Sequence, residues 1–492
     1  MQLVKERFAY LFKSTKGLIL VAIAMIGLET ALFGMLSGPM AEFGIREVVV
    51  RIFRMSLVPA EREGRIIILY HSIAMAVLAI EVYMITSLLK IKEIYRVSVR
   101  ALITVGYLMV MIFGMGFAYW GHNWALHGLF IAGLTLIFFA GLLLTIALWP
   151  WNKEYYQPDP AYAHSRSGLD IERLAFFATS LTTLISSIFG AVPGSYLGNG
   201  FQAFLAENII RSPDKTAMEF SVIGHLHIML ALIAIMLTLI IGRWLDFKGL
   251  LHKIAMPLMI VGTIVLNLGV WGVVTPLEPV AHMIIYVGAT PSMLAALMLV
   301  VFSWDKFIRQ GIAGIPKPNA WQKLKALGSD PLKFGPLWQM VFMNFTVSGV
   351  GILMAVKLDE VFRLWAARDE RIELTGHWHI LSGIIATIIL LYYGDMIGLK
   401  GKIRRWYGWG IIILSDIAFA SVTIFEIKRL FVSEAVQQPL VNTVMWLADF
   451  GLGMLLVILA LLMIWRLIDL LKRKGRWSEE VDQDDLQVEV GR

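Results

Sequence analysis

Twelve long apolar stretches, separated by short polar segments, constrain the fold of this chain more than any other feature. They cover residues 17–37, 66–89, 100–120, 124–149, 172–193, 219–242, 253–274, 279–303, 336–357, 373–394, 407–427 and 441–470. Each is long enough to cross about 30 Å of hydrocarbon as a helix. Because a spanning backbone must satisfy its own hydrogen bonds, we expect an all-α integral membrane protein with about 12 transmembrane helices.

The composition agrees with a membrane protein and excludes several other classes. Hydrophobic residues make up 58% of the 492 residues and charged residues 16%, whereas soluble domains are about 45–50% apolar and about 25% charged. The net charge of +7 comes from Lys and Arg in the loops, so it does not indicate a nucleic-acid partner. The chain has no cysteine, which excludes disulfides, cysteine-ligated iron–sulfur clusters and covalently attached c-type haem.

The basic residues predict how the chain is oriented. Residues 1–16 form a basic amphipathic segment, and further basic clusters lie at 90–100, 243–253, 306–333, 400–405 and 466–476. Since basic loops stay in the cytoplasm, we expect a multi-pass protein of the cell membrane with both termini cytoplasmic and lipid around it. A single membrane domain, 17–475, is followed by an acidic cytoplasmic tail, 476–492, that is expected to be disordered.

A near-repeat of histidine motifs opens three of the apolar stretches. Residues 224–229 read GHLHIM, residues 376–381 read GHWHIL, and a weaker echo at 70–75 reads YHSIAM. His127 follows His71 by 56 residues, and His282 follows His227 by 55. The motifs predict three pseudo-repeats of four spans, at about 17–149, 172–303 and 336–470.

Seven of the ten histidines fall at one depth, near the starts of spans that run inward from the outer surface. They are His71, His127, His225, His227, His282, His377 and His379. An imidazole in a bilayer is costly unless its ring nitrogens have partners. Residues two apart on a helix point about 200° apart, so the members of each pair face different neighbours and can ligate two separate haems.

Two structural alternatives to haem ligation stay open for these histidines. They can form hydrogen bonds between helices, or they can bind zinc, although zinc needs three or four ligands around one point and the pairs face opposite ways. His164 and His252 lie in or beside loops, and we expect both to be solvated.

On these residues the chain resembles the catalytic subunit of the haem–copper oxidase superfamily, which includes nitric oxide reductases. That family has twelve spans in three pseudo-repeats. A His-x-His pair on the tenth span ligates two haems, and the second span supplies the other axial ligand of the low-spin haem. His377-Trp378-His379 and His71 match this pattern, and the resemblance covers most of residues 17–470 in span order.

The chain departs from the family at the copper site. Oxygen reductases carry a metal-ligand histidine followed by Pro-Glu on the sixth span, whereas His227 is followed by Ile228 and Met229. The seventh span of the family carries adjacent histidines, whereas residues 267–271 read NLGVW. The resemblance therefore predicts neither a copper site nor a non-haem iron site.

The repeat alignment gives the expected ligand pairs. His379 with His71 makes one bis-histidine haem, and His227 with His377 makes a second. His225 would face Ile73, which cannot ligate, so a third site there is empty, five-coordinate, or completed by His127 or His282. Because no haem can be attached covalently, the expected cofactor is haem b, two or three per chain.

Six-coordinate haems suit electron transfer, since they offer no open position to a substrate. We therefore expect a multi-haem b-type membrane cytochrome, an electron-transfer subunit of a respiratory complex. It would move electrons between membrane quinol and an extracytoplasmic cytochrome or iron–sulfur subunit. Two alternatives stay open. One is a terminal oxygen or nitric oxide reductase acting at a five-coordinate haem on His225, an oxidoreductase. The other is a proton-coupled transporter without haem.

Residues around the histidines complete the prediction. Each ligand histidine should donate its other ring N–H to a carbonyl or carboxylate, and Ser72, Glu373 and Thr375 lie within a turn of one. Trp120, Trp124 and Trp271 fit interfacial anchors better than porphyrin contacts. The carboxylates that can carry protons, or alternatively form structural hydrogen bonds, are Glu81, Asp416, Glu278 and Asp449. Residues 194–218 and 357–372 are candidate docking segments.

Overall fold

The computed structural model of the chain describes residues 2–37, 41, 43–58, 62–121, 123–196, 217–357, 360–361 and 376–472. Within these ranges the regular structure is helical, apart from one isolated antiparallel bridge between His164 and Asp170. The expected all-α class is confirmed for this part of the chain.

Twelve helical segments of the described chain are long and apolar enough to cross a membrane, as the hydropathy predicted. They are α2 (Thr15–Ser37), α5 (Arg62–Leu88), α6 (Glu93–Trp120), α7 (Trp124–Ala147), α8 (Ile171–Tyr196), α9 (Ala217–Trp244), α10 (Leu250–Gly272), α11 (Glu278–Gly311), the span Pro331–Met354, α16 (Gly376–Met396), α17 (Gly401–Phe431) and α18 (Glu434–Lys472). Several extend beyond their apolar stretches, because helix continues through polar residues into the flanking segments.

The span Pro331–Met354 is interrupted by a π-helical turn. It consists of α13 (Pro331–Phe342), the π turn Met343–Val347, and α14 (Ser348–Val356). Such turns add a residue to the helix and shift the faces on either side of it. The shorter described helices are α1 (Gln2–Lys13), α4 (Ile45–Phe53), a 3₁₀ turn at Lys153–Tyr155 and α12 (Ala320–Leu327).

The chain divides into two compact units. Unit 1 holds residues 1–149, 183–204 and 459–492, and unit 2 holds residues 150–182 and 205–458. In unit 1, α6 packs against α5 and α7, and the N-terminal helix α1 meets the end of α18. There the guanidinium of Arg466 donates to the hydroxyl of Tyr10, and Tyr10 packs against Leu470.

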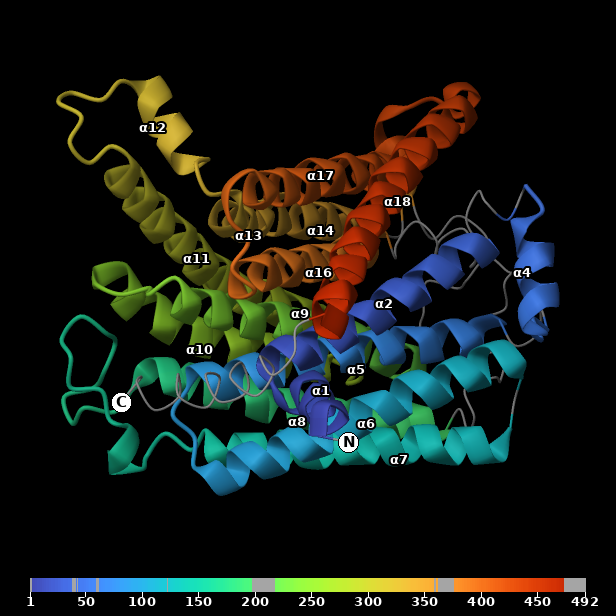
Figure 1. The fold of residues 1–492 in the computed structure, drawn as a ribbon, viewed down its shortest axis with the longest axis horizontal. Helices are drawn as coiled ribbons and strands as arrows, with labels where there is room; N and C mark the ends of the chain where they lie inside the picture. The colour runs from blue at the N-terminus through green and yellow to red at the C-terminus, as the bar shows by residue number, and fades with distance from the viewer. Residues whose placement is uncertain are drawn as a thin grey trace. The chain divides into compact units, whose positions relative to one another are not determined.

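In unit 2, glycines let pairs of helices approach closely. The helices α13, α14, α16 and α17 lie in one group (Figure 1), and α16 contacts α17. At that contact Gly376 lies against Glu426 and, seven residues away on each helix, Gly383 lies against Phe419. Small residues at such contacts are how membrane helices gain packing without a hydrophobic driving force. This regular antiparallel contact fixes which α17 residue lies beside the start of α16.

The contact between α10 and α11 is tight enough to test. A Cβ at Gly262 would lie 2.3 Å from Oγ of Ser292 and 2.9 Å from the carbonyl oxygen of Gly288. Gly262→Val should therefore lower the free energy of unfolding by about 1–3 kcal/mol through overpacking, measured as a lower thermal unfolding midpoint in detergent. Gly128→Val is the control, because no atom lies within 4 Å of a Cβ built there. Equal midpoints for the two variants would contradict the packing.

Candidate functional site

Two histidines from different motifs lie together in unit 2: His227, in the N-terminal half of α9, and His377, in the first turn of α16. The ring centroids of His227 and His377 lie 6.0 Å apart, with the rings tilted by 35°. A metal–imidazole bond is about 2 Å long, so two imidazoles on opposite sides of one metal ion have centroids about 6 Å apart. The two rings are therefore close enough that they could hold one haem between them, although Nε2 of His227 accepts a hydrogen bond from Trp378 in this structure.

His227 has both ring nitrogens occupied. Its Nδ1 lies 2.9 Å from the carbonyl oxygen of Ile223, one turn earlier on α9, and its Nε2 accepts a hydrogen bond of 2.8 Å from Nε1 of Trp378. The indole also meets the imidazole edge-on, with centroids 4.3 Å apart. An indole N–H only donates, so Nε2 carries the lone pair and Nδ1 carries the proton.

His377 lies between a carboxylate and a glycine. Its Nδ1 is 3.7 Å from Oε1 of Glu426, a residue of α17 with 0% of its surface exposed. On the other edge of the ring, a Cβ built at Gly351 of α14 would lie 3.7 Å from Nε2. Nδ1 therefore faces a carboxyl group, and Nε2 faces a helix surface without a side chain.

His71 in unit 1 shows the same backbone arrangement as His227. Its Nδ1 lies 2.8 Å from the carbonyl oxygen of Ile67, again one turn earlier. Ser72 does not serve His71, since its hydroxyl donates to the carbonyl of Ile68 at 3.0 Å. The partner expected for His71, His379, is an exposed residue of unit 2. Because each unit is described by itself, their pairing stays a prediction.

The remaining predicted ligands have different surroundings. His225 is half-buried on α9. The ring of His127 stacks on Phe117, with centroids 5.3 Å apart and planes 7° apart. His282 is 47% exposed, and its Nδ1 lies 3.7 Å from Oε1 of Glu278 on its own helix. An aromatic stack and an exposed ion pair both fit structural roles for these two histidines.

The predicted proton-path carboxylates fall into two groups. Asp416 accepts hydrogen bonds from Nε1 of Trp338 at 2.9 Å and from Nε2 of Gln339 at 3.4 Å, as a structural carboxylate would. Glu81 is 1% exposed, and its Oε1 has no hydrogen-bond partner in the described chain. Oδ2 of Asp449 also has no hydrogen-bond partner in the described chain. Glu29 of α2, which the sequence reasoning missed, is 1% exposed with neither oxygen partnered in the described residues.

The donor chemistry of these histidines fits haem ligation. Ligating histidines donate the ring N–H that faces away from the metal to a carbonyl or carboxylate. His71 and His227 each have Nδ1 at a backbone carbonyl, and His377 has Nδ1 near a carboxylate. In each case Nε2 is the nitrogen suited to iron, although at His227 the indole of Trp378 would have to move away first. Among the described residues, no three His, Asp or Glu side chains gather around one point as a zinc site requires.

A second polar cluster in unit 2 corrects the expectation for His252. That histidine is 0% exposed rather than solvated, because residues 156–170 fold over it. Its Nδ1 accepts a hydrogen bond of 3.0 Å from the backbone N–H of Ala163, and its Nε2 lies 3.7 Å from Oε2 of Glu172. The same carboxylate oxygen accepts from Arg243 at 3.2 Å. His164 is half-buried, with Nδ1 at 2.9 Å from the carbonyl of Tyr162.

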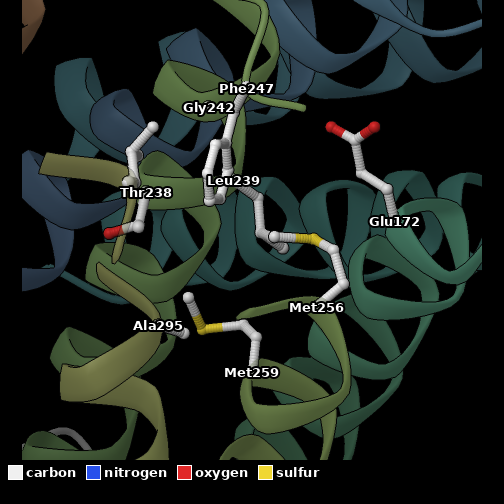
Figure 2. Close-up of a pocket in the computed structure, with 9 residues that line it drawn as sticks. Glu172, Thr238, Leu239, Gly242, Phe247, Met256, Met259 and Ala295 are labelled. Atoms are coloured by element: carbon white, nitrogen blue, oxygen red, sulfur yellow. The ribbon is translucent and has the colours of Figure 1, made fainter. Parts of the chain in front are cut away.

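A small cavity lies beside Glu172. Its volume is ≈ 10 Å³, about what one water molecule needs. Figure 2 shows the side chains of Met256 and Met259, from α10, projecting toward this space, with Glu172 at its margin. Thr238, which also lines it, stands eleven residues after His227 on α9, or about 16 Å along the helix axis. The cavity is thus separate from the histidine site.

Ionisable groups in the loop over His252, and one just after the end of α9, have shifted pKa values. Burial raises the pKa of the Tyr162 hydroxyl to about 12, and its hydrogen bond to Asp246 adds to the effect. Burial alone would raise the pKa of Asp246, but hydrogen bonds from Lys248 and Tyr162 and the nearby ammonium of Lys306 together lower it. Burial also raises the pKa of Asp170. These interactions anchor the loop to the end of α9.

Some predicted residues lie outside the described part of the chain. They are Glu373 and Thr375, most of the docking segments 194–218 and 357–372, and the tail 476–492. Trp120 and Trp124 are exposed, and Nε1 of Trp120 donates to the carbonyl of Phe53 at 2.9 Å. Trp271 is half-buried at the end of α10.

No protein-family model matches the chain, and no curated protein matches it.

The sequence reasoning did not find Glu426 as the neighbour of His377, nor the hydrogen bond from Trp378 to His227. The sequence does show that Glu426 is a carboxylate near the end of the apolar stretch 407–427, where the repeat alignment has Trp120 and Trp271 in the other two repeats. Such a position indicates that a partner is needed, but only the packing of α16 on α17 identifies the partner.

The burial of His252 yields a stability prediction. His252→Phe leaves the buried N–H of Ala163 without its acceptor, so the free energy of unfolding should fall by about 1–3 kcal/mol. The matched control is His164→Phe, since His164 contacts a carbonyl only two residues away. Chemical unfolding in detergent compares the two. A loss no larger for His252→Phe than for the control would show that this hydrogen bond does not hold the loop.

Proposed function

We propose that this chain is a multi-haem b-type membrane cytochrome, the electron-transfer subunit of a respiratory complex. One observation carries the proposal: histidines from two separate His-x-His motifs, His227 and His377, have ring centroids 6.0 Å apart on two neighbouring helices, α9 and α16. Their Nδ1 atoms both face acceptors, which leaves Nε2 as the ligand nitrogen.

The ligand assignment follows from the motifs. His227 and His377 would hold one haem in unit 2, and His71 with His379 a second. His225 would serve a third site if one is occupied. Haem supplies a one-electron iron couple when bound, and two imidazoles at each iron leave no position open for substrate. The chain's own residues bind and orient the group, fix the tautomer of each imidazole, and keep the iron in a low-polarity setting.

The physiological setting follows from the charge pattern and the family resemblance. We propose that the protein lies in the cell membrane with both termini cytoplasmic and the histidine motifs toward the outer side. The partners are then membrane quinol and an extracytoplasmic cytochrome or iron–sulfur subunit. The topology resembles that of haem–copper oxidase catalytic subunits, and no copper site is proposed. A quinol releases protons as well as electrons when it is oxidised, and the proposal assigns a part in that release to the buried Glu29 and Glu81.

Trp378 has a defined part in this proposal. Its N–H donates to the lone pair of His227 Nε2, which is the lone pair that iron would use. Haem entry at this site therefore requires the indole to leave that nitrogen and turn toward the porphyrin or the lipid.

Proton-coupled transport without haem is the second candidate. The observation that favours it is the same hydrogen bond, because a histidine joined to tryptophan across two helices also fits interhelical packing. The buried carboxylates Glu29 and Glu81 suit either candidate. A Soret band in the purified protein would decide between them.

Haem content tests the ligand assignment. The purified protein should contain two or three haems b per chain in a pyridine haemochrome assay, and His227→Ala and His377→Ala should each lose the same one. His164→Ala is the control, because this histidine bonds a loop carbonyl. Unchanged haem content in the His227 and His377 variants, or equal loss in the control, would contradict the assignment. A colourless wild-type protein would contradict the function as a whole.

Carbon monoxide distinguishes electron transfer from reduction of a gas. With two six-coordinate haems, the reduced protein should show no carbon monoxide difference spectrum. An adduct that disappears in His225→Ala would instead indicate a five-coordinate haem on His225 and a terminal reductase. His164→Ala again serves as the unaffected control.

A further inference from the structure

The carboxylate of Glu426 occupies an unusual place at the start of α16. Its side chain comes from α17, is 0% exposed, and has Oε1 3.7 Å from Nδ1 of His377. A Cβ added to Gly376 would lie 2.3 Å from that same Oε1. The glycine that opens the GHWHIL motif is therefore the residue that leaves room for this carboxylate.

The position of Glu426 is fixed by the packing of the two helices. Further along the interface Gly383 of α16 meets Phe419 of α17, where an added Cβ would lie 2.6 Å from a ring carbon. The two glycine contacts are seven residues apart on each helix. Sliding one helix along the other would therefore bring other α16 residues, which carry side chains, against Glu426 and Phe419. A carboxyl group held this way lies beside the imidazole, with Oε1 3.7 Å from Nδ1 of His377.

The acceptors behind the three histidines differ in charge. His71 and His227 have neutral backbone carbonyls at Nδ1, from Ile67 and Ile223. His377 has a buried carboxylate. A carboxylate draws the Nδ1 proton more strongly than a carbonyl does, which makes the opposite nitrogen a better electron donor to a metal. In a site of low polarity this difference is enlarged.

We propose that Glu426 is a positioning residue for His377: it accepts the Nδ1–H, which leaves Nε2 as the ligand nitrogen, and it makes the haem held by His377 the one of lower reduction potential. The inference rests on the proposed function, because it concerns a haem ligand.

Redox titration of the purified holoprotein in detergent tests the proposal. The wild-type protein should show at least two potentials. Glu426→Gln removes the charge but keeps the side-chain size, so it should shift the lower potential in the positive direction while the higher potential and the haem content stay unchanged. Glu434→Gln, an exposed residue at the start of α18, is the matched control and should shift neither.

A second variant keeps the test sharp if Glu426→Gln does not fold. Gly376→Ala places a methyl group against the carboxylate and should push it away from Nδ1, with the same positive shift. Full haem content with both potentials unchanged in either folded variant would overturn the role of Glu426 and leave the cytochrome intact. A wild-type protein without haem would overturn the proposed function itself.

Discussion

The free-energy cost of placing a polar group in hydrocarbon determines where this chain's polar side chains find hydrogen-bond partners. A histidine in a membrane helix must find partners for two ring nitrogens. His71 and His227 solve half of the problem with the carbonyl one turn earlier, which every helix offers. The other nitrogen then looks outward from the helix. The protein thus presents ring nitrogens with their lone pairs directed at neighbours, an arrangement that suits a metal or an N–H donor.

Close packing between helices brings the histidines beside polar groups from other helices. Glycines at 376 and 383 let α16 approach α17 until a carboxylate lies beside an imidazole. In the same unit, glycines at 262 and 269 bring α10 against α11. Without large apolar side chains between them, the helices are held by backbone contact and by polar pairs, and each polar pair lies where the register puts it.

Hydropathy was enough to predict the twelve spans, because length and apolar content are local properties of the sequence. The repeat also led to the expectation that His227 and His377 face each other, and their rings lie 6.0 Å apart. Their role as ligands stays a prediction. Glu426 escaped notice because its contact depends on the register of two helices. His252 was placed wrongly because a loop far back in the sequence covers it.

The π-helical turn at Met343–Val347 has a consequence for the wall of the histidine site. One extra residue in a helix rotates everything after it by about 100°. Without that insertion, the surface that α14 offers to the ring of His377 would carry a neighbour of Gly351, such as Val350 or Ile352, in place of bare backbone. A single added residue therefore decides whether the ring of His377 meets bare backbone or a branched side chain.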